Sequence, residues 1–237
     1  MNKPVLSQEV LEKRQAHYRK IAHLLIEHYG YPEWRQHLPP VDELVCTILS
    51  QATSDTNRDK GFYSLKARFP DWESVRDAPV EAIQQAIHSA GLSNMKAPRI
   101  KSALQFITDT VGDISLDFLQ AMDINEARHW LTQIEGIGLK TASIILLFCY
   151  NKPAFPVDTH VHRVTRRLGL VNENADATKA HYLMEQIAEP ENFYADHLNI
   201  IRHGREVCKA QRPRCEQCFL KTYCQYYQKL SDGESQA

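Results

Sequence analysis

The chain of 237 residues has little glycine and no long hydrophobic run. Nine glycines are few for an architecture built from many tight β-turns, and no long alternation of β-branched and polar residues predicts a strand. No apolar stretch reaches the roughly 18 residues of a membrane-spanning helix, and the N-terminus lacks the pattern of a secretion signal. We therefore expect an all-α, soluble intracellular protein without a membrane partner.

The chain also lacks an excess of charge of one sign, since its net charge is −1. Positive charge is concentrated locally instead: Arg163, Arg166 and Arg167 lie in a run without acidic residues from 159 to 172. A second concentration lies in the C-terminal third, comprising Arg202, Arg205, Lys209, Arg212, Arg214 and Lys221. Such runs are more often solvated faces than binding sites, so they support a nucleic-acid site only where another feature points to one.

Two glycines one residue apart, Gly136 and Gly138, separate two helical patterns. The first pattern begins at Asp123 with Glu126 three residues later, which is typical of a helix start. The second covers residues 139–150 and is apolar on nearly all sides, as in a buried helix. We predict a helix, a two-glycine hairpin and a second helix, with uncovered N–H groups and a helix dipole that together bind a phosphate.

Lys140 lies in the first turn of the second helix, where the helix dipole and burial both disfavour the ammonium form. A neutral amine there can act as a nucleophile, and the alternative is a solvated lysine beside the phosphate. Asp158 follows Pro156 and begins the next helical pattern, and the intervening chain is long enough to bring it back to Lys140. Its carboxylate can cap a helix and also face a developing positive charge. We predict that Lys140 and Asp158 are catalytic.

The pattern Gly136-Ile137-Gly138-x-Lys140 with Asp158 resembles the helix-hairpin-helix DNA glycosylases of the endonuclease III type. The resemblance implies that Lys140 attacks C1′ of a flipped-out damaged nucleoside while Asp158 stabilises the oxocarbenium-like sugar. It also implies a Schiff base and strand cleavage by β-elimination. The adenine-specific relatives lack a lysine at this position, so Lys140 argues against that specificity.

The polar corner over residues 50–55 is similar to the family's Ser-x-Gln-x-x-Asp segment, in which the glutamine fills the gap left by the flipped base. The sequence departs from that pattern, because Ala52 holds the glutamine position and Gln51 lies one residue earlier. We expect Gln51 to contact DNA. A helix cap or a turn residue is the alternative role.

Residues 91–97 also match the family, in which the residue at the position of Leu92 is a wedge in the duplex. Opening a base pair costs stacking energy, and an apolar plug recovers part of it. From its residue type alone, Leu92 could equally pack into the core. With the resemblance, we predict that Leu92 contacts DNA.

Four of the six cysteines lie close together near the C-terminus: Cys208, Cys215, Cys218 and Cys224. In a chain that otherwise looks intracellular, this spacing indicates a metal site rather than disulfides, and four thiolates suit zinc or a [4Fe–4S] cluster. The spacing matches the cluster loop of the endonuclease III family, so the resemblance implies that these cysteines bind a [4Fe–4S] cluster. We expect the rigid loop to present three phosphate-binding cations: Lys209, Arg212 and Arg214.

The resemblance covers about residues 20–226 and implies a two-domain helix-hairpin-helix glycosylase fold. Residues 36–152 would form a six-helix domain ending in the hairpin, and residues 1–35 with 153–230 would form the domain that carries the cluster. We expect the polar tail over residues 231–237 to be disordered.

We expect a bifunctional DNA glycosylase and abasic-site lyase of base-excision repair. It would act as a monomer, in the cytoplasm or at the nucleoid, on double-stranded DNA with a damaged base or an abasic site, and oxidised pyrimidines are the first choice of substrate. One alternative is a uracil or mismatch glycosylase on the same scaffold. The other is a non-catalytic iron–sulphur DNA-binding protein or redox module, which would need the glycines and basic residues but not Lys140 and Asp158.

Overall fold

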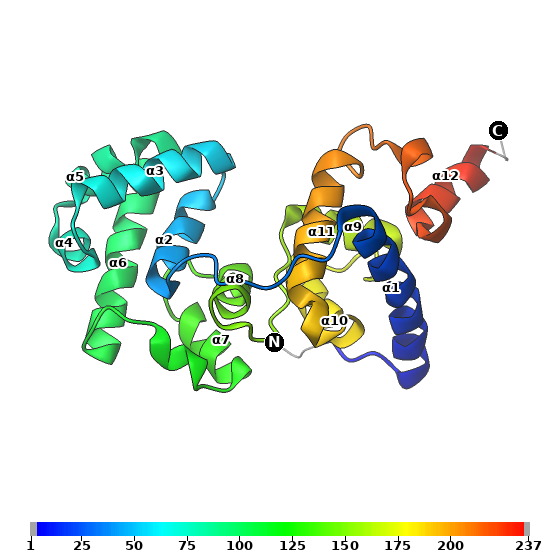
Figure 1. Cartoon of the computed structure of the whole chain (residues 1–237), viewed down its shortest axis with the longest axis horizontal. Helices are drawn as coiled ribbons and strands as arrows, with labels where there is room; N and C mark the ends of the chain where they lie inside the picture. Colours follow the sequence, from blue (N-terminus) through cyan, green and yellow to red (C-terminus); the bar gives the residue numbers. More distant parts are fainter. Residues whose placement is uncertain (1–3, 235–237) are drawn as a thin grey trace. The chain divides into compact units, whose positions relative to one another are not determined.

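The structure is a computed structural model that describes residues 4–234, and its described elements are helices without a β-strand (Figure 1). The chain divides into two compact units. We call residues 36–150 the middle unit, and residues 1–35 with 151–237 the terminal unit. Within residues 4–234, no helix combines the length and the hydropathy that crossing a membrane requires.

The middle unit contains seven α-helices where we expected six. The α-helices of this unit are α2 (Pro40–Ser50), α3 (Asp55–Arg68), α4 (Trp72–Asp77), α5 (Val80–Ala86), α6 (Ser93–Val111), α7 (Ile124–Thr132) and α8 (Leu139–Tyr150). Two 3₁₀ turns complete it, η1 (His88–Ala90) and η2 (Asp117–Gln120). The unit ends at Tyr150, two residues before the boundary that we expected.

The core of the middle unit surrounds α2, which contacts α3, α6 and α8. Leu44, Ile48 and Leu49 of α2 are fully buried. α3 packs closely on η1 through Gly61, where an added Cβ would lie 2.9 Å from the Cβ of Ala90. Burying these apolar side chains fixes the helix ends from which the loops of the unit emerge.

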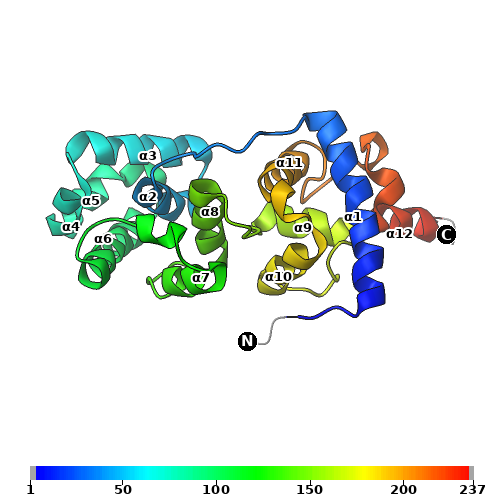
Figure 2. The same cartoon turned by 60° about the horizontal axis from the view of Figure 1, so that its bottom comes forward.

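The terminal unit is built from both ends of the chain (Figure 2). Its helices are α1 (Gln8–Tyr29), α9 (Thr159–Leu168), α10 (Ala177–Ile187), α11 (Phe193–Glu206) and α12 (Gln225–Glu234), with the 3₁₀ turns η3 (Pro190–Asn192), η4 (Cys215–Gln217) and η5 (Lys221–Tyr223). The long helix α1 packs against α10 and α11. The N-terminal helix therefore contributes buried side chains to a core that it shares with helices from the C-terminal part of the chain.

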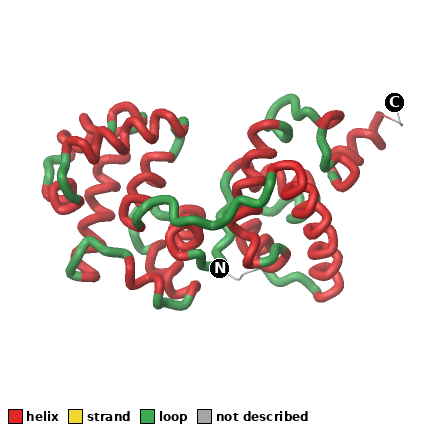
Figure 3. Tube along the Cα trace, in the orientation of Figure 1, coloured by secondary structure: helices red, strands yellow, loops and turns green. Residues whose placement is uncertain are grey.

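The core of the terminal unit contains an aromatic pair and a buried tyrosine–aspartate contact. Phe155 and Phe193 meet edge to face with ring centroids 5.1 Å apart, and the Tyr18 hydroxyl donates a hydrogen bond to the Asp196 carboxylate. The C-terminal tail differs from our expectation of disorder from residue 231, because α12 continues to Glu234 (Figure 3). Residues 235–237 lie outside the described residues.

Candidate functional site

The two predicted glycines form the turn between α7 and α8. Gly136 has φ +80°, which L-residues with a side chain adopt with strain, and the N–H of Ile137 donates to the Ile134 carbonyl at 3.0 Å. Ile134 and Ile137 are buried whereas both glycines are exposed. A Cβ added at Gly138 would meet nothing within 4 Å. The turn is anchored by its isoleucines and is open at Gly138, whereas Arg99 lies close to Gly136.

Lys140 is the second residue of α8 and is partly exposed. The residues that follow it, Thr141 and Ala142, are buried, and so is most of the helix. The Asp123 side chain caps the N-terminus of α7, accepting from the N–H of Asn125 at 2.8 Å. Lys140 thus projects from the solvent-accessible end of a helix that the core holds firmly.

Gln51 lies directly after α2, and its side-chain amide is bonded within the middle unit. Its Nε2 donates to the Gly136 carbonyl at 3.5 Å, and its Oε1 accepts from Arg99 Nη1 at 3.1 Å. Ala52, which follows it, is exposed and has φ +51°. The polar corner is therefore tied to the hairpin through Gln51, and Arg99 is a contributor that sequence reasoning missed.

Leu92 is 50% exposed, so it is not a core side chain. It occupies the N-cap position of α6 with φ +50° and follows Gly91, which has φ +68°. Met95, one turn into α6, is also exposed. The loop thus presents an apolar side chain to solvent on a left-handed backbone, a placement that favours the predicted wedge over the core alternative.

Asp158 is the N-cap residue of α9, as its position before a helical pattern predicted. Its Oδ1 accepts the N–H of Val161 at 2.7 Å, and the residue is partly buried. This bond fixes the side-chain orientation, because an N-cap carboxylate must point along the first turn of its helix. The carboxylate has a second oxygen for another partner.

Two buried histidines hold the chain that leads to Asp158. The N–H of Val157 donates to Nε2 of His181 at 3.3 Å, so Nδ1 of this ring carries the proton that is donated to the Phe155 carbonyl at 2.7 Å. His197 Nδ1 lies 3.0 Å from the Pro156 carbonyl. These histidines come from α10 and α11. Their spacing in the sequence gave no signal of this role.

The four clustered cysteines line one hollow in the terminal unit. Within residues 4–234, no three His, Cys, Asp or Glu side chains are arranged to hold a single metal ion. Burial raises the pKa of the Cys218 thiol to about 11 and also raises that of Cys215 and Cys224. Four thiols lining one partly enclosed hollow fit a polynuclear cluster, which takes one thiolate at each iron and displaces the thiol protons on binding.

Two arginines of α9 fasten the cysteine loop. Arg163 donates from Nε to the Cys208 carbonyl at 2.9 Å and from Nη2 to the Gly204 carbonyl at 2.9 Å. Arg167 Nη1 donates to the Lys209 carbonyl at 2.7 Å and lies 3.4 Å from Cys208 Sγ. The positive run that sequence reasoning treated as a possible nucleic-acid face therefore serves in part to hold the loop.

The three predicted phosphate-binding cations, Lys209, Arg212 and Arg214, are all exposed. The loop that carries them closes on itself, because the Val207 carbonyl accepts the N–H of Lys209 at 2.9 Å and that of Arg214 at 3.0 Å. Arg212 adopts φ +49°. The loop geometry turns the three cations toward solvent.

Comparison with protein families identifies the fold and the cofactor. A model described as "HhH-GPD superfamily base excision DNA repair protein" matches residues 45–190. The chain belongs to the HhH-GPD superfamily of base-excision DNA repair proteins. A second model, the iron–sulphur binding domain of endonuclease III, matches residues 208–224 of this glycosylase. Its cofactor is a [4Fe–4S] cluster, as predicted.

Similar proteins include endonuclease III of Sulfolobus acidocaldarius, 35% identical over 78% of this glycosylase and 81% of the relative. Endonuclease III of Thermotoga maritima is 31% identical over 86% of this chain and 91% of the relative. This chain also aligns with the protein in a solved non-covalent endonuclease III–DNA complex. The alignment covers 92% of this chain and 98% of the other, with 26% identity and a TM-score of 0.78. This HhH-GPD protein is therefore a DNA-binding glycosylase of base-excision repair.

Proposed function

We propose that this glycosylase is bifunctional: it removes an oxidised pyrimidine from duplex DNA and then cleaves the strand as an abasic-site lyase. The observation that carries the proposal is the position of Lys140. Lys140 is a partly exposed residue in the first turn of the mostly buried helix α8, directly after the glycine turn, which is open at Gly138. A nucleophile on a rigid element beside a phosphate site can be held in a reactive geometry.

In the proposed reaction, the lone pair of Lys140 Nζ forms a bond to C1′, and the bond from C1′ to the base breaks with its electrons leaving on the base. The Asp158 carboxylate faces the positive charge that develops on the sugar. Loss of a proton from nitrogen and opening of the sugar ring give an imine, after which removal of a C2′ proton expels the 3′ phosphate. A similar structure, of 26% identity and TM-score 0.78, is a trapped endonuclease III–DNA covalent intermediate, which supports a covalent step here.

The remaining predicted residues have proposed roles in gripping the DNA. The open N–H groups at Gly136 and Gly138 bind a backbone phosphate, Leu92 enters the duplex as a wedge, and Gln51 occupies the space that the flipped base leaves. The cluster is held by Cys208, Cys215, Cys218 and Cys224. When bound, it supplies a rigid core for the loop whose cations, Lys209, Arg212 and Arg214, bind further phosphates. One chain supplies all of these groups, so we propose that the enzyme acts as a monomer.

Borohydride trapping tests this function. The purified holoprotein is incubated with borohydride and duplexes that carry thymine glycol, uracil opposite guanine, or an abasic site. We expect a covalent adduct with the thymine glycol and abasic duplexes, and we expect Lys140→Gln to abolish it. Lys60→Gln, which removes an exposed lysine of α3, is the matched control and should trap as the wild type does.

The duplexes also separate the alternatives. Faster trapping or base release on uracil opposite guanine would replace the oxidised-pyrimidine specificity with that of a uracil or mismatch glycosylase. Base release without an adduct would make the enzyme monofunctional. DNA binding with neither product would leave a non-catalytic iron–sulphur DNA-binding protein.

A further inference from the structure

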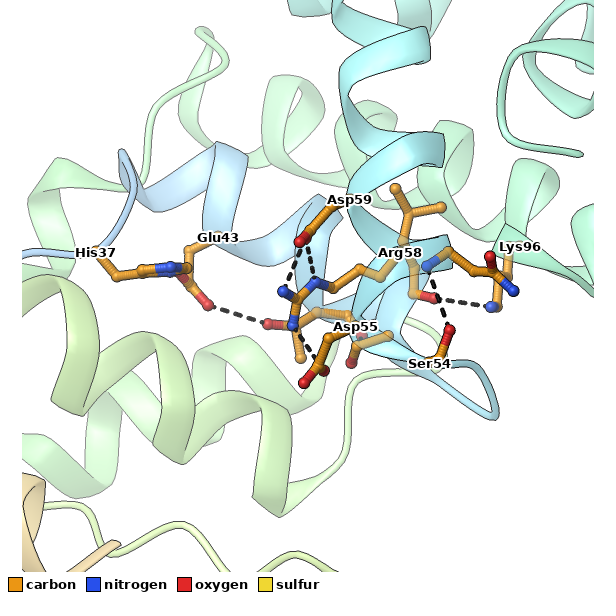
Figure 4. A network of polar contacts seen from close by, with 11 residues as sticks. His37, Glu43, Ser54, Asp55, Arg58, Asp59 and Lys96 are labelled. Atoms are coloured by element: carbon orange, nitrogen blue, oxygen red, sulfur yellow. Dashed lines mark hydrogen bonds and ion pairs between the residues drawn. The ribbon is translucent and has the colours of Figure 1, made fainter. Parts of the chain in front are cut away.

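A lysine is buried beneath the two loops that carry Gln51 and Leu92. Lys96 is only 1% exposed, although lysine is among the residues that proteins most rarely bury. Its Nζ donates to the carbonyl of Leu49 at 2.8 Å and to the carbonyl of Ala90 at 2.8 Å (Figure 4). One ammonium group therefore bridges two segments that are far apart in the sequence.

Both partners of Lys96 are carbonyls at helix ends. Leu49 lies in the last turn of α2, and Ala90 is the last residue of η1, so neither carbonyl has the partner that a continuing helix would give it. The C-terminal end of a helix dipole favours a cation. Burial lowers the pKa of the Lys96 ammonium, and these two carbonyls offset part of its desolvation. The arrangement stabilises both helix ends only while the lysine connects them.

The loops that begin at these carbonyls carry strained backbone. Ala52 has φ +51° and Leu92 has φ +50°, and a left-handed residue with a side chain costs roughly 1–2 kcal/mol. Such conformations persist where the surroundings over-determine them. Lys96 fixes the chain at Leu49, three residues before Ala52. It also fixes the chain at Ala90, two residues before Leu92.

Arg99, one turn further along α6, connects the same corner to the hairpin. Its Nη1 donates to Gln51 Oε1 at 3.1 Å, and its Cδ lies 3.2 Å from the place where a Cβ on Gly136 would stand. The first two turns of α6 thus reach the corner, the Leu92 loop and the glycine turn. Three proposed DNA contacts depend on one helix for their relative placement.

The far side of the corner is fixed by the first turn of α3 (Figure 4). Ser54 caps this helix by accepting the N–H of Asn57 at 3.3 Å. Arg58 pairs with Asp55 at 3.2 Å and with Asp59 at 2.7 Å. The corner is held at both ends, so a change at Lys96 would act on its position rather than on the existence of α3.

We propose that Lys96 is a positioning residue that holds Gln51 and Leu92 in one fixed relative placement, so that wedge insertion and filling of the vacated space occur together. This inference rests on the proposed DNA contacts of these two residues. Base release requires the target base to leave the stack, whereas attack on an existing abasic site requires no base extrusion. Loss of Lys96 should therefore slow base release more than Schiff-base formation on abasic DNA.

The test compares Lys96→Met with Lys101→Met in the full holoprotein. Lys101 lies on the same helix, and its Nζ donates to the carbonyls of Arg76 and Ala78, each at 2.7 Å. The Lys101→Met variant therefore loses an equivalent pair of bonds to helix-end carbonyls, at a place away from the two loops. The readouts are the single-turnover rate of base release from the duplex that the wild type prefers, and the rate of borohydride trapping on an abasic duplex.

We expect Lys96→Met to slow base release by roughly tenfold or more, because displacements near 1 Å in positioning groups can cost up to about a hundredfold, while trapping changes less than about threefold. Lys101→Met should lower the melting temperature by a similar amount but leave the ratio of the two rates unchanged. Equal slowing of both rates by Lys96→Met, or an equal change of ratio in Lys101→Met, would show that Lys96 has a structural role only.

Two further measurements keep the outcomes separate. In a Leu92→Ala background, Lys96→Met should have a much smaller effect on base release, since the two residues act together. An undiminished effect there would overturn the proposal. If Lys96→Met does not fold, Lys96→Gln, which keeps one donor group, is measured for the same ratio. A wild type that releases no base and traps no duplex would contradict the proposed function, whereas an active wild type with an unchanged variant ratio would contradict this inference alone.

Discussion

In the middle unit, the loops carrying Gln51 and Leu92 are held by cations of one helix, α6, that reach the ends of neighbouring helices. In the terminal unit, the chain before Asp158 and the cysteine loop are held by side chains of α9, α10 and α11. In the middle unit, two cations of a single helix make these bonds, to residues between positions 49 and 90. The terminal unit brings together residues from positions 155 to 208.

This difference shows which parts of the molecule depend on the cofactor. The middle unit has a mostly aliphatic core and helix-end bonds made by its own side chains. The terminal unit contains a hollow lined by four cysteines and is completed by the N-terminal helix α1. We therefore expect loss of the cofactor, a change of pH and a substitution between packed helices to lower the stability of the terminal unit more than that of the middle unit.

The largest effect should follow from breaking the cluster site. Cys218→Ser should remove iron and sulphide from the purified protein and lower the free energy of unfolding by on the order of 3 kcal/mol or more, because binding energy at such a site is folding energy. Proteases should then cleave within residues 208–224 first. The measurements are iron content, thermal unfolding and limited proteolysis.

The matched control is Cys46→Ala in the middle unit. Cys46 is buried, and burial raises the pKa of its thiol to about 12, so it behaves as a small core side chain. This variant should lose about 1 kcal/mol and keep its iron. Iron loss in Cys46→Ala, or full iron content in Cys218→Ser, would contradict the comparison.

A second effect should come from Asp196 in the terminal core. Burial raises the pKa of this carboxyl to about 7, and its Oδ1 has no hydrogen-bond partner in the described part of the chain. Between about pH 4 and pH 7 the folded state holds a proton that the unfolded state has released, so stability falls as the pH rises through this window. The free energy of unfolding should fall by at most roughly 4 kcal/mol across this window.

Asp196→Asn should remove the fall in stability with rising pH. Urea unfolding at pH 5 and pH 8 would measure the free energy of unfolding of both proteins. The variant should be less pH-dependent than the wild type over that window and more stable than it at pH 8. Tyr18→Phe is the control: it removes the hydroxyl that bonds Asp196 but leaves the carboxyl, so the decline with pH should persist. A flat wild-type profile would refute the assignment.

The smallest effects on stability should come from substituting two glycines, one closely packed and one on an open surface. A Cβ at Gly204 would lie 3.0 Å from the Cβ of His160, which moves only with the backbone of α9. Gly204→Ala should therefore cost about 1–2 kcal/mol, after allowing for the better helix propensity of alanine. Gly138→Ala meets nothing within 4 Å and should leave stability within about 0.5 kcal/mol.

Gly138→Ala should nevertheless weaken binding to abasic duplex DNA, because the added methyl stands on the open face of the glycine turn where we propose a phosphate. Thermal unfolding and DNA titration of both variants make the comparison. A strongly destabilised Gly138→Ala would place this glycine in the packing of the unit instead.

Several elements followed from local sequence. α8 covers Leu139–Tyr150, as its apolar pattern predicted, and α9 begins directly after Asp158, as that residue's position predicted. The N-cap roles of Asp123 and Asp158 followed from residue type and position. Patterns over ten or twenty residues identify these features because a helix depends on its own side chains and its caps.

The supports of the site did not follow from local sequence. Nothing in the sequence marked Lys96 as buried, yet it lies between two helix ends. Arg163 and Arg167 looked like a basic surface, yet they fasten the cysteine loop. In each case the partner is a main-chain carbonyl, and carbonyls carry no residue-specific signal in a sequence.

The sequence by itself determined the helical architecture, the glycine turn before Lys140, the cap at Asp158 and the spacing of four cysteines, because these depend on residue type and short-range periodicity. Only the tertiary structure decided that Leu92 is exposed, that Gln51 is bonded to the hairpin, and that histidines and cations from distant helices hold the loops. Those outcomes depend on which helix ends meet in space, and that is set by the packing of whole units rather than by any one segment.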